Sequence, residues 1–176
     1  MDNISQLLTD YPGLFRAFRI LTVTSTIFIS GLSFCLSTWV IPNIYLIPPA
    51  YQAKQFTATV EKGARYLMRA SRTMMFTLVL NTILTYLHPD PAIQRQWKRW
   101  AAMVCTLVPA APYEIFAIFP INDKIMAMNK QVEKDKQELS EQQVRELKSL
   151  LQKWAARNFG RIAMPLLAGV IGMYSL

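Results

Sequence analysis

ILTVTSTIFISGLSFCLSTWVIPNIYLIPPAYQA, residues 20–53, decides the fold because it contains no Lys, Arg, Asp or Glu. A helix needs about 20 apolar residues to cross the hydrocarbon core of a bilayer, and this stretch alone is long enough. Charged residues make up 17% of the chain, whereas a soluble domain has about 25%. The sequence therefore predicts an integral membrane protein.

Three more apolar segments follow along the chain. The four expected spans are about residues 20–41, 66–87, 100–121 and 158–176. Pro42 is expected to end or kink the first span, and Pro109 and Pro112 to distort the third, because proline lacks the backbone N–H that a helix interior uses. The expected fold class is all-α: a four-helix transmembrane bundle forming one domain, residues 1–176.

The longest polar stretch, about residues 123–157, precedes the last span. Within it Ser140 and Gln143 have the spacing of a capping box. Beyond this cap, apolar residues recur at helical spacing as far as Trp154. The pattern predicts an additional amphipathic helix outside the membrane. Basic residues in this stretch and between Lys54 and Arg72 place both segments in the cytosol by the positive-inside rule, with both termini on the far side.

The chain has a net charge of +8, which raises the question of which anionic partner it binds. The basic residues lie beside the apolar runs, so the lipid bilayer and its anionic headgroups are the expected partner. No zinc-finger spacing or RNA-binding signature indicates nucleic acid. Cys35 and Cys105 lie inside apolar runs and are interpreted as small buried hydrophobes. A retained first span without a sorting signal fits the endoplasmic reticulum.

Glu114 is the most informative polar residue, because it lies in the third apolar segment and no charged residue stands between Arg99 and it. An ionisable group at membrane depth is costly and usually has a partner or a function. Glu114 is therefore either a general base or half of a structural ion pair with Arg157 or Arg161.

In other expected helices, polar residues recur every three or four positions, so that they lie on one face of the helix. Asn81 and His88 belong to such a stripe in the second segment, where they either pack between helices or contact a substrate. As the only histidine, His88 cannot form a multi-histidine metal site, and no metal site is expected. Trp154, Asn158 and Arg161 share one stripe before the last span, which is either an interfacial anchor or a set of donors with a stacking surface.

Two motifs carry a family resemblance. Residues 111–125, APYEIFAIFPINDKI, followed by residues 151–161, LQKWAARNFGR, resemble the fungal anthrone oxygenase-like family of small membrane proteins. The distinctive elements are Pro120-x-Asn122-Asp123 and Trp154-x3-Asn158-x2-Arg161. Ile121 departs from this pattern, since many relatives have a hydroxyl residue there.

The resemblance implies a four-span membrane protein that oxidises an anthrone to a quinone with molecular oxygen, without metal, flavin or other cofactor. Such a reaction needs a base, donors for the substrate oxyanion, and a dry pocket for a hydrophobic small molecule. The implied base is Glu114 or Asp123. The implied oxyanion donors are Asn122, Asn158 and Arg161, and the implied substrate contacts are Trp154, Asn81, His88 and Tyr113.

Two other functions remain open from the sequence. An isomerase or cyclase of an enolisable lipophilic metabolite would use the same base and donors. A non-catalytic membrane adaptor would use the amphipathic helix to bind a partner. The adaptor predicts that Glu114, Asn122, Asn158 and Arg161 point apart, whereas both enzymes need these side chains around one cavity.

Overall fold

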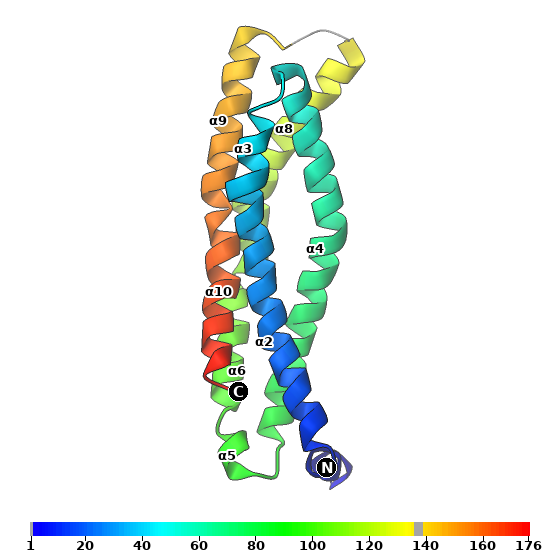
Figure 1. The fold of residues 1–176 in the computed structure, drawn as a ribbon, viewed down its shortest axis with the longest axis vertical. Helices are drawn as coiled ribbons and strands as arrows, with labels where there is room; N and C mark the ends of the chain where they lie inside the picture. Colours follow the sequence, from blue (N-terminus) through cyan, green and yellow to red (C-terminus); the bar gives the residue numbers. More distant parts are fainter. Residues whose placement is uncertain (1, 136–138) are drawn as a thin grey trace. The chain divides into compact units, whose positions relative to one another are not determined.

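The computed structural model describes residues 2–135 and 139–176, and within them the ordered elements are all helices (Figure 1). The described residues contain no β-strand, which confirms the all-α class. In chain order the elements are α1 Asp2–Asp10, α2 Pro12–Cys35, η1 Leu36–Val40, α3 Ile41–Ile44, α4 Pro49–Tyr86, α5 Pro91–Gln94, α6 Trp97–Leu107, α7 Ala110–Tyr113, η2 Glu114–Ile118, α8 Phe119–Asp135, α9 Glu141–Arg157 and α10 Phe159–Met173, where η marks a π-helix.

Contacts between residues divide the chain into two compact units. Unit 1 comprises Met1–Ser30, Arg69–Pro109 and Ala163–Leu176, and unit 2 comprises Gly31–Met68 and Ala110–Ile162. Each unit has an apolar core of its own.

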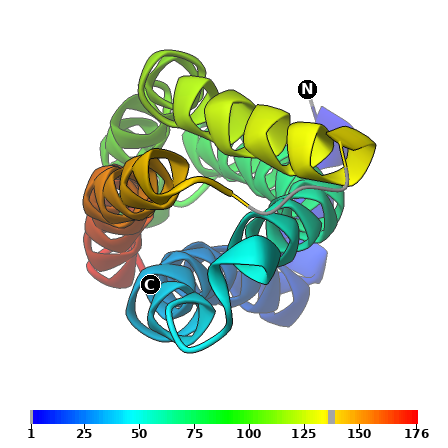
Figure 2. The ribbon, with the colours of Figure 1, turned by 90° about the horizontal axis from the view of Figure 1, so that it is seen from above.

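Unit 2 is built from η1, α3, the first half of α4, η2, α8 and α9. Helix α9 contacts both α8 and η1, and the view along the helices shows it between the chain segments that hold them (Figure 2). The core of this unit is Ile41, Ile44, Ala53, Phe56, Ile118, Ile121, Ile125, Met128, Leu147, Leu150, Leu151 and Trp154. The amphipathic stripe of α9 is therefore buried against the rest of unit 2.

Unit 1 packs α2, the second half of α4, α6 and α10 around a smaller core. That core is Val23, Met74, Leu78, Trp100, Met103, Leu107 and Ala168. Helix α10 approaches α2 closely at Gly169, where an added Cβ would lie 2.4 Å from Cγ1 of Ile27. Glycine at this position lets the two backbones come together.

Two helical stretches, Pro12–Ile44 and Pro91–Asp135, are long and apolar enough to cross a membrane. The most apolar part of the second is only 17% buried within the protein, so most of its apolar side chains face outward, as they do on a helix in contact with lipid. Helix α10 has 15 residues, fewer than the about 20 of a typical span. Only Asn158 separates it from α9.

Both π-helices end two residues before a proline. Helix η1 closes with the Ile41 N–H donating to the Leu36 carbonyl, directly before Pro42. Helix η2 closes in the same way: the Phe119 N–H donates to the Glu114 carbonyl, directly before Pro120. A proline ring collides with the carbonyl four residues earlier in a regular α-helix, and the wider π turn relieves that collision.

Of the two expectations for Pro42, an end or a kink of the first helix, the end is wrong, because the widened turn before the proline lets the helix continue to Ile44. The expected distortion of the third segment is confirmed: α6 ends at Leu107 and a new helix starts after Pro109.

Other boundaries also differ from expectation. Helix α4 begins at Pro49, well before residue 66, because proline is well tolerated in a first helical turn. The capping box of Ser140 and Gln143 is confirmed at the start of α9. The polar stretch expected over residues 123–157 consists of the end of α8 and then α9, and residues 136–138 lie outside the described residues.

Candidate functional site

A cavity inside unit 2 brings together an acid, an arginine and an amide. Glu114, Asn122 and Arg161 line it from η2, α8 and the start of α10. The space open to the centre of a water molecule is about 50 Å³, enough for a few waters. The other lining residues are mostly apolar and include Leu36, Val40, Phe56, Val60, Leu67 and Phe119. The cavity therefore has apolar walls and a small charged part.

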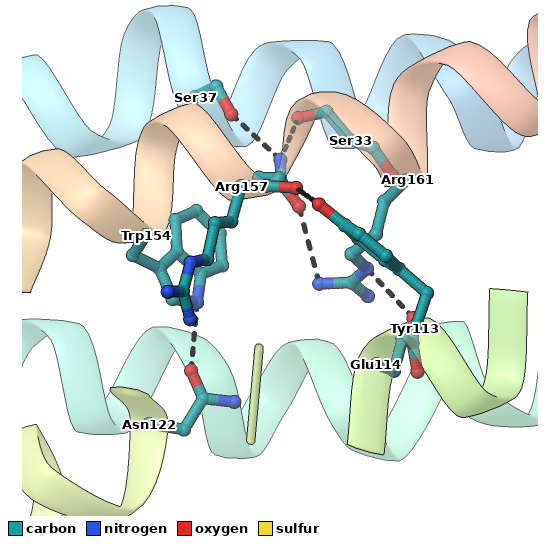
Figure 3. A network of polar contacts seen from close by, with 9 residues as sticks. Ser33, Ser37, Tyr113, Glu114, Asn122, Trp154, Arg157 and Arg161 are labelled. Carbon is teal, nitrogen blue, oxygen red and sulfur yellow. Dashed lines mark hydrogen bonds and ion pairs between the residues drawn. The ribbon is translucent and has the colours of Figure 1, made fainter. Parts of the chain in front are cut away.

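The charged part is an ion pair between Glu114 and Arg161. Nε of Arg161 lies 2.8 Å from Oε1 of Glu114, and the two side chains are 21% and 27% exposed, respectively. Glu114 is the first residue of η2, so its position depends on the irregular turn between Pro112 and Pro120. Figure 3 shows the carboxylate facing the guanidinium. The charges partly neutralise each other, and the pair retains access to solvent or a ligand.

Asn158 connects this pair to the first long helix. Its Nδ2 donates to the Ser33 carbonyl and to Oγ of Ser37, each at 2.7 Å. Its Oδ1 accepts a long, 3.5 Å contact from Nη1 of Arg161. Asn158 is fully buried, and these contacts fix the orientation of its amide. It therefore positions Arg161 rather than facing the cavity itself.

Trp154 and Asn122 form a second pair on the cavity wall. The indole Nε1 of Trp154 donates to Oδ1 of Asn122 at 2.8 Å, and the indole packs edge-on against Phe56 with ring centroids 5.5 Å apart. The bond engages the oxygen of the Asn122 amide. Its nitrogen remains the part of this amide that can donate to a ligand.

Tyr113 contributes to the packing behind the site. Its hydroxyl donates to the Arg157 carbonyl, and Nη1 of Arg157 donates to the Ala117 carbonyl at 3.0 Å. Cβ of any residue in place of Gly160 would lie 2.5–2.9 Å from three atoms of the Tyr113 side chain. The ring thus lies directly on the helix backbone, where only glycine leaves room for it.

Comparison with known protein families gives a match. The family model described as anthrone oxygenase matches residues 64–171, more than half of the chain. The chain belongs to the anthrone oxygenase family. No curated protein and no solved structure matches it.

The residues matched by the anthrone oxygenase family include Glu114, Arg161 and Asn158, which contact one another. They also include the hydrogen-bonded pair of Trp154 and Asn122. Ser33 and Ser37 lie outside the matched residues. Ser33 and Ser37 are four residues apart, a spacing that places two side chains on one face of a helix, and this is the only signal for their shared role that the sequence offers.

Not every sequence-predicted residue lies at this cavity. Asp123 is exposed on α8 and does not line it, because it follows Asn122 on the helix and points to another face. Tyr113 lies behind the site as described. Asn81 and His88 belong to unit 1. Of the two arginines expected as ion-pair partners of Glu114, Arg161 forms the pair and Arg157 does not.

The arrangement suits proton transfer next to a developing negative charge. Only Oε1 of Glu114 is engaged by Arg161, so the second carboxylate oxygen can accept a proton. The guanidinium carries five N–H donors, and the ion pair with Glu114 and the contact with Asn158 use two of them. Among the described residues, no three His, Cys, Asp or Glu side chains are grouped to hold a metal ion.

Proposed function

We propose that this chain is a membrane-embedded, cofactor-independent oxygenase that converts an anthrone-like aromatic polyketide to a quinone with molecular oxygen. The observation that supports this most is the Glu114–Arg161 pair in a cavity with mostly apolar walls. Membership of the anthrone oxygenase family supports the same reaction class. The convergence of Glu114, Asn122 and Arg161 on one cavity favours the enzyme functions over an adaptor.

The proposed reaction begins with loss of a proton from the anthrone methylene. The product is an aromatic, electron-rich anion whose charge lies largely on the ring oxygen. This anion gives an electron to O2, and the resulting radicals combine to form a C–O bond at the former methylene carbon. The peroxide then takes up a proton to give a hydroperoxide. Loss of the remaining C–H proton from the same carbon forms the C=O bond as the O–O bond breaks, and the hydroxide that leaves takes up this proton to become water. One oxygen atom ends in the new carbonyl and the other in water.

In this proposal Glu114 removes the methylene proton and later returns it to the peroxide. Arg161 donates to the ring oxygen, where negative charge develops, and Asn122 supplies a second N–H. Asn158 holds the guanidinium in place through Oδ1. Trp154 is the stacking wall for the planar substrate, oriented by its bond to Asn122.

The cavity must widen before a three-ring substrate can enter, since it holds only a few waters. The wall formed by α4 is the place for this change, because Gly63 and Ala64 line the cavity with little or no side chain. An apolar substrate dissolved in lipid would reach that wall from the bilayer. This route fits the proposed four-span bundle and a location in the endoplasmic reticulum.

The test is quinone formation by membranes that contain the protein, compared with empty membranes and followed by absorbance with a hydroxylated anthrone. The proposal predicts a protein-dependent rate above spontaneous oxidation that survives chelation with EDTA. A rate equal to that of empty membranes for every anthrone tested would overturn it. A protein-dependent product of unchanged mass would instead indicate the isomerase.

A further inference from the structure

Unit 1 buries an arginine on its first long helix. Arg19 on α2 is only 5% exposed, and among the described residues no carboxylate lies within ion-pair distance of it. Its guanidinium carbon lies 5.4 Å from the ring centroid of Phe15 and 5.6 Å from that of Trp100. Its Nη2 donates to Oε1 of Gln96. These contacts are with neutral groups only.

Other polar atoms in the same unit are buried without a partner. Nε of Arg19, Nε1 of Trp100, Oγ1 of Thr85 and Oδ1 of Asn81 have no hydrogen bond to any part of the chain that the structure describes. Trp100, Thr85 and Asn81 are fully buried. Asn81 belongs to the Arg19 surroundings because its Nδ2 donates to Oγ1 of Thr22, three residues along α2, at 2.8 Å. Three of the four unpartnered atoms can donate a hydrogen bond.

A buried charge without a counter-ion is costly, and each buried donor without an acceptor adds to the cost. Contacts with two aromatic rings offset only part of it. The group that would satisfy a guanidinium together with neutral N–H and O–H donors is an anion with several oxygens, such as a phosphate or a carboxylate.

We propose that Arg19 is the centre of an anion-binding site for a phosphate or carboxylate group. Gln96 is the point of entry, because it is half-buried in the link between α5 and α6 and its neutral oxygen already contacts the guanidinium. The incoming anionic oxygen takes the place of that amide oxygen. Figure 1 shows α5 and the start of α6 at the same end of unit 1 as the start of α2.

Two sources can supply such a group. Arg19 directly precedes the uncharged stretch that starts at Ile20, so it lies where lipid headgroups meet the apolar core and an anionic lipid can deliver its phosphate. Free phosphate from solution is the other source. The site is separate from the proposed reaction, since its residues belong to unit 1 and those of the Glu114 cavity to unit 2.

The first experiment measures the thermal midpoint of the full chain in phosphatidylcholine nanodiscs. Phosphatidylglycerol is added in one arm and inorganic phosphate in another, at equal ionic strength. We expect a rise of about 3 °C or more in at least one arm, because a ligand that binds only the folded state stabilises it. A rise with phosphatidylglycerol alone identifies the lipid as the source, and a rise with phosphate alone identifies the free anion. No rise in either arm overturns the proposal.

Variants test whether Arg19 is responsible. Arg19→Gln should abolish the rise, whereas Arg16→Gln, an equal charge change at an exposed position one turn earlier, should keep it. Equal rises in wild type and Arg19→Gln would overturn the proposal.

A second variant decides the matter even if Arg19→Gln does not fold. Gln96→Glu places a carboxylate at the position of the amide oxygen. It should raise the midpoint in phosphatidylcholine alone and remove the response to either anion. Gln94→Glu adds the same charge at an exposed position nearby and should keep the response. A Gln96→Glu protein that responds like wild type would contradict the site.

Discussion

Glu114 and Arg161 serve both stability and the proposed chemistry, and substitutions can separate the two roles. Glu114→Gln leaves the arginine without its carboxylate, which should destabilise the protein by about 1–2 kcal/mol, between the values for exposed and buried pairs. It should also lower turnover by about 100-fold or more, because the proposed general base is lost. Thermal unfolding and quinone formation measure the two effects.

The double variant Glu114→Gln/Arg161→Gln is the informative control. Removing both charges should recover part of the lost stability while turnover stays low. Glu133→Gln, which breaks an exposed pair with Lys54 at 4.0 Å, should change neither quantity. A double variant that recovers turnover together with stability would show that the pair is only structural.

At this scale the sequence indicated that polar residues would meet better than it indicated the hydrogen-bond partners of each. Glu114 and Arg161 were expected from their cost at membrane depth, and they do meet. Asn158 was expected as an oxyanion donor, but its amide is used by Ser33 and Ser37. Such roles depend on partners more than 100 residues away in the chain, which no local spacing reveals.

At the scale of the elements, the contact of Gly160 with Tyr113 fixes how α10 starts. Gly160→Ala places a methyl group 2.5–2.9 Å from the tyrosine side chain, so the ring must move and lose its bond to the Arg157 carbonyl. We expect a loss of about 1–3 kcal/mol in stability, as for other overpacked positions. Gly31→Ala is the matched control, because its Cβ meets nothing within 4 Å, and it should be neutral or stabilising in denaturant unfolding.

Helix α4 offers a test of the cavity that leaves its polar residues intact. Gly63 lines the cavity, and an added Cβ there approaches only Cδ1 of Leu67, at 3.9 Å. Gly63→Ala should stabilise the helix by about 0.5–1 kcal/mol with turnover nearly unchanged. Gly63→Leu should fill the space and raise KM for an anthrone several-fold. An unchanged KM in Gly63→Leu would place substrate binding elsewhere.

The helices themselves followed from sequence where a local signal exists. Ser140 and Gln143 marked the start of α9, and Pro109 marked the end of α6. The two π-helices could not be predicted from proline alone, since a proline can equally end a helix. The choice depends on neighbours that hold the chain helical on both sides, such as the contact of η1 with α9.

At the scale of the whole molecule, one histidine links stability to pH. Burial lowers the pKa of His88; the charge of Arg19 also lowers it, and Asp90 opposes the change. The Nδ1 atom accepts a bond from the Asp90 amide at 3.0 Å, which requires that nitrogen to be unprotonated. Because the pKa is lower in the folded state, the stabilisation is complete above about pH 6.5 and is lost as the pH falls through the folded pKa.

The thermal midpoint at pH 7.5 and at pH 5.5 measures this dependence. His88→Asn keeps an acceptor near the Asp90 amide and removes the titration, so its midpoint should change less over this interval. As His88 is the only histidine and carboxylates titrate mainly below pH 5, the difference between the two proteins reports this side chain. An equal change of the thermal midpoint in the wild-type protein and in His88→Asn would contradict the role of His88.

The class of the whole molecule was predictable because it follows from composition. An uncharged stretch of membrane-spanning length indicated membrane helices, and two helical stretches meet the requirements of length and apolarity. The division into two units was not predictable. The division depends on which other helices each half of a long helix contacts. Apolar periodicity shows which face of a helix is buried, but it does not show which helix packs against that face.

Incorporation of ¹⁸O from labelled oxygen gas, measured by mass spectrometry of the quinone alongside O2 uptake, tests the central claim most directly. Purified protein with an anthrone should consume one O2 per quinone and place one labelled atom in the new carbonyl. Glu114→Gln should slow both the uptake and the labelled product to near the spontaneous rate. O2 uptake no faster than in protein-free samples would contradict the account. So would an unlabelled new carbonyl oxygen, if a control shows that the quinone carbonyl does not exchange its oxygen with water.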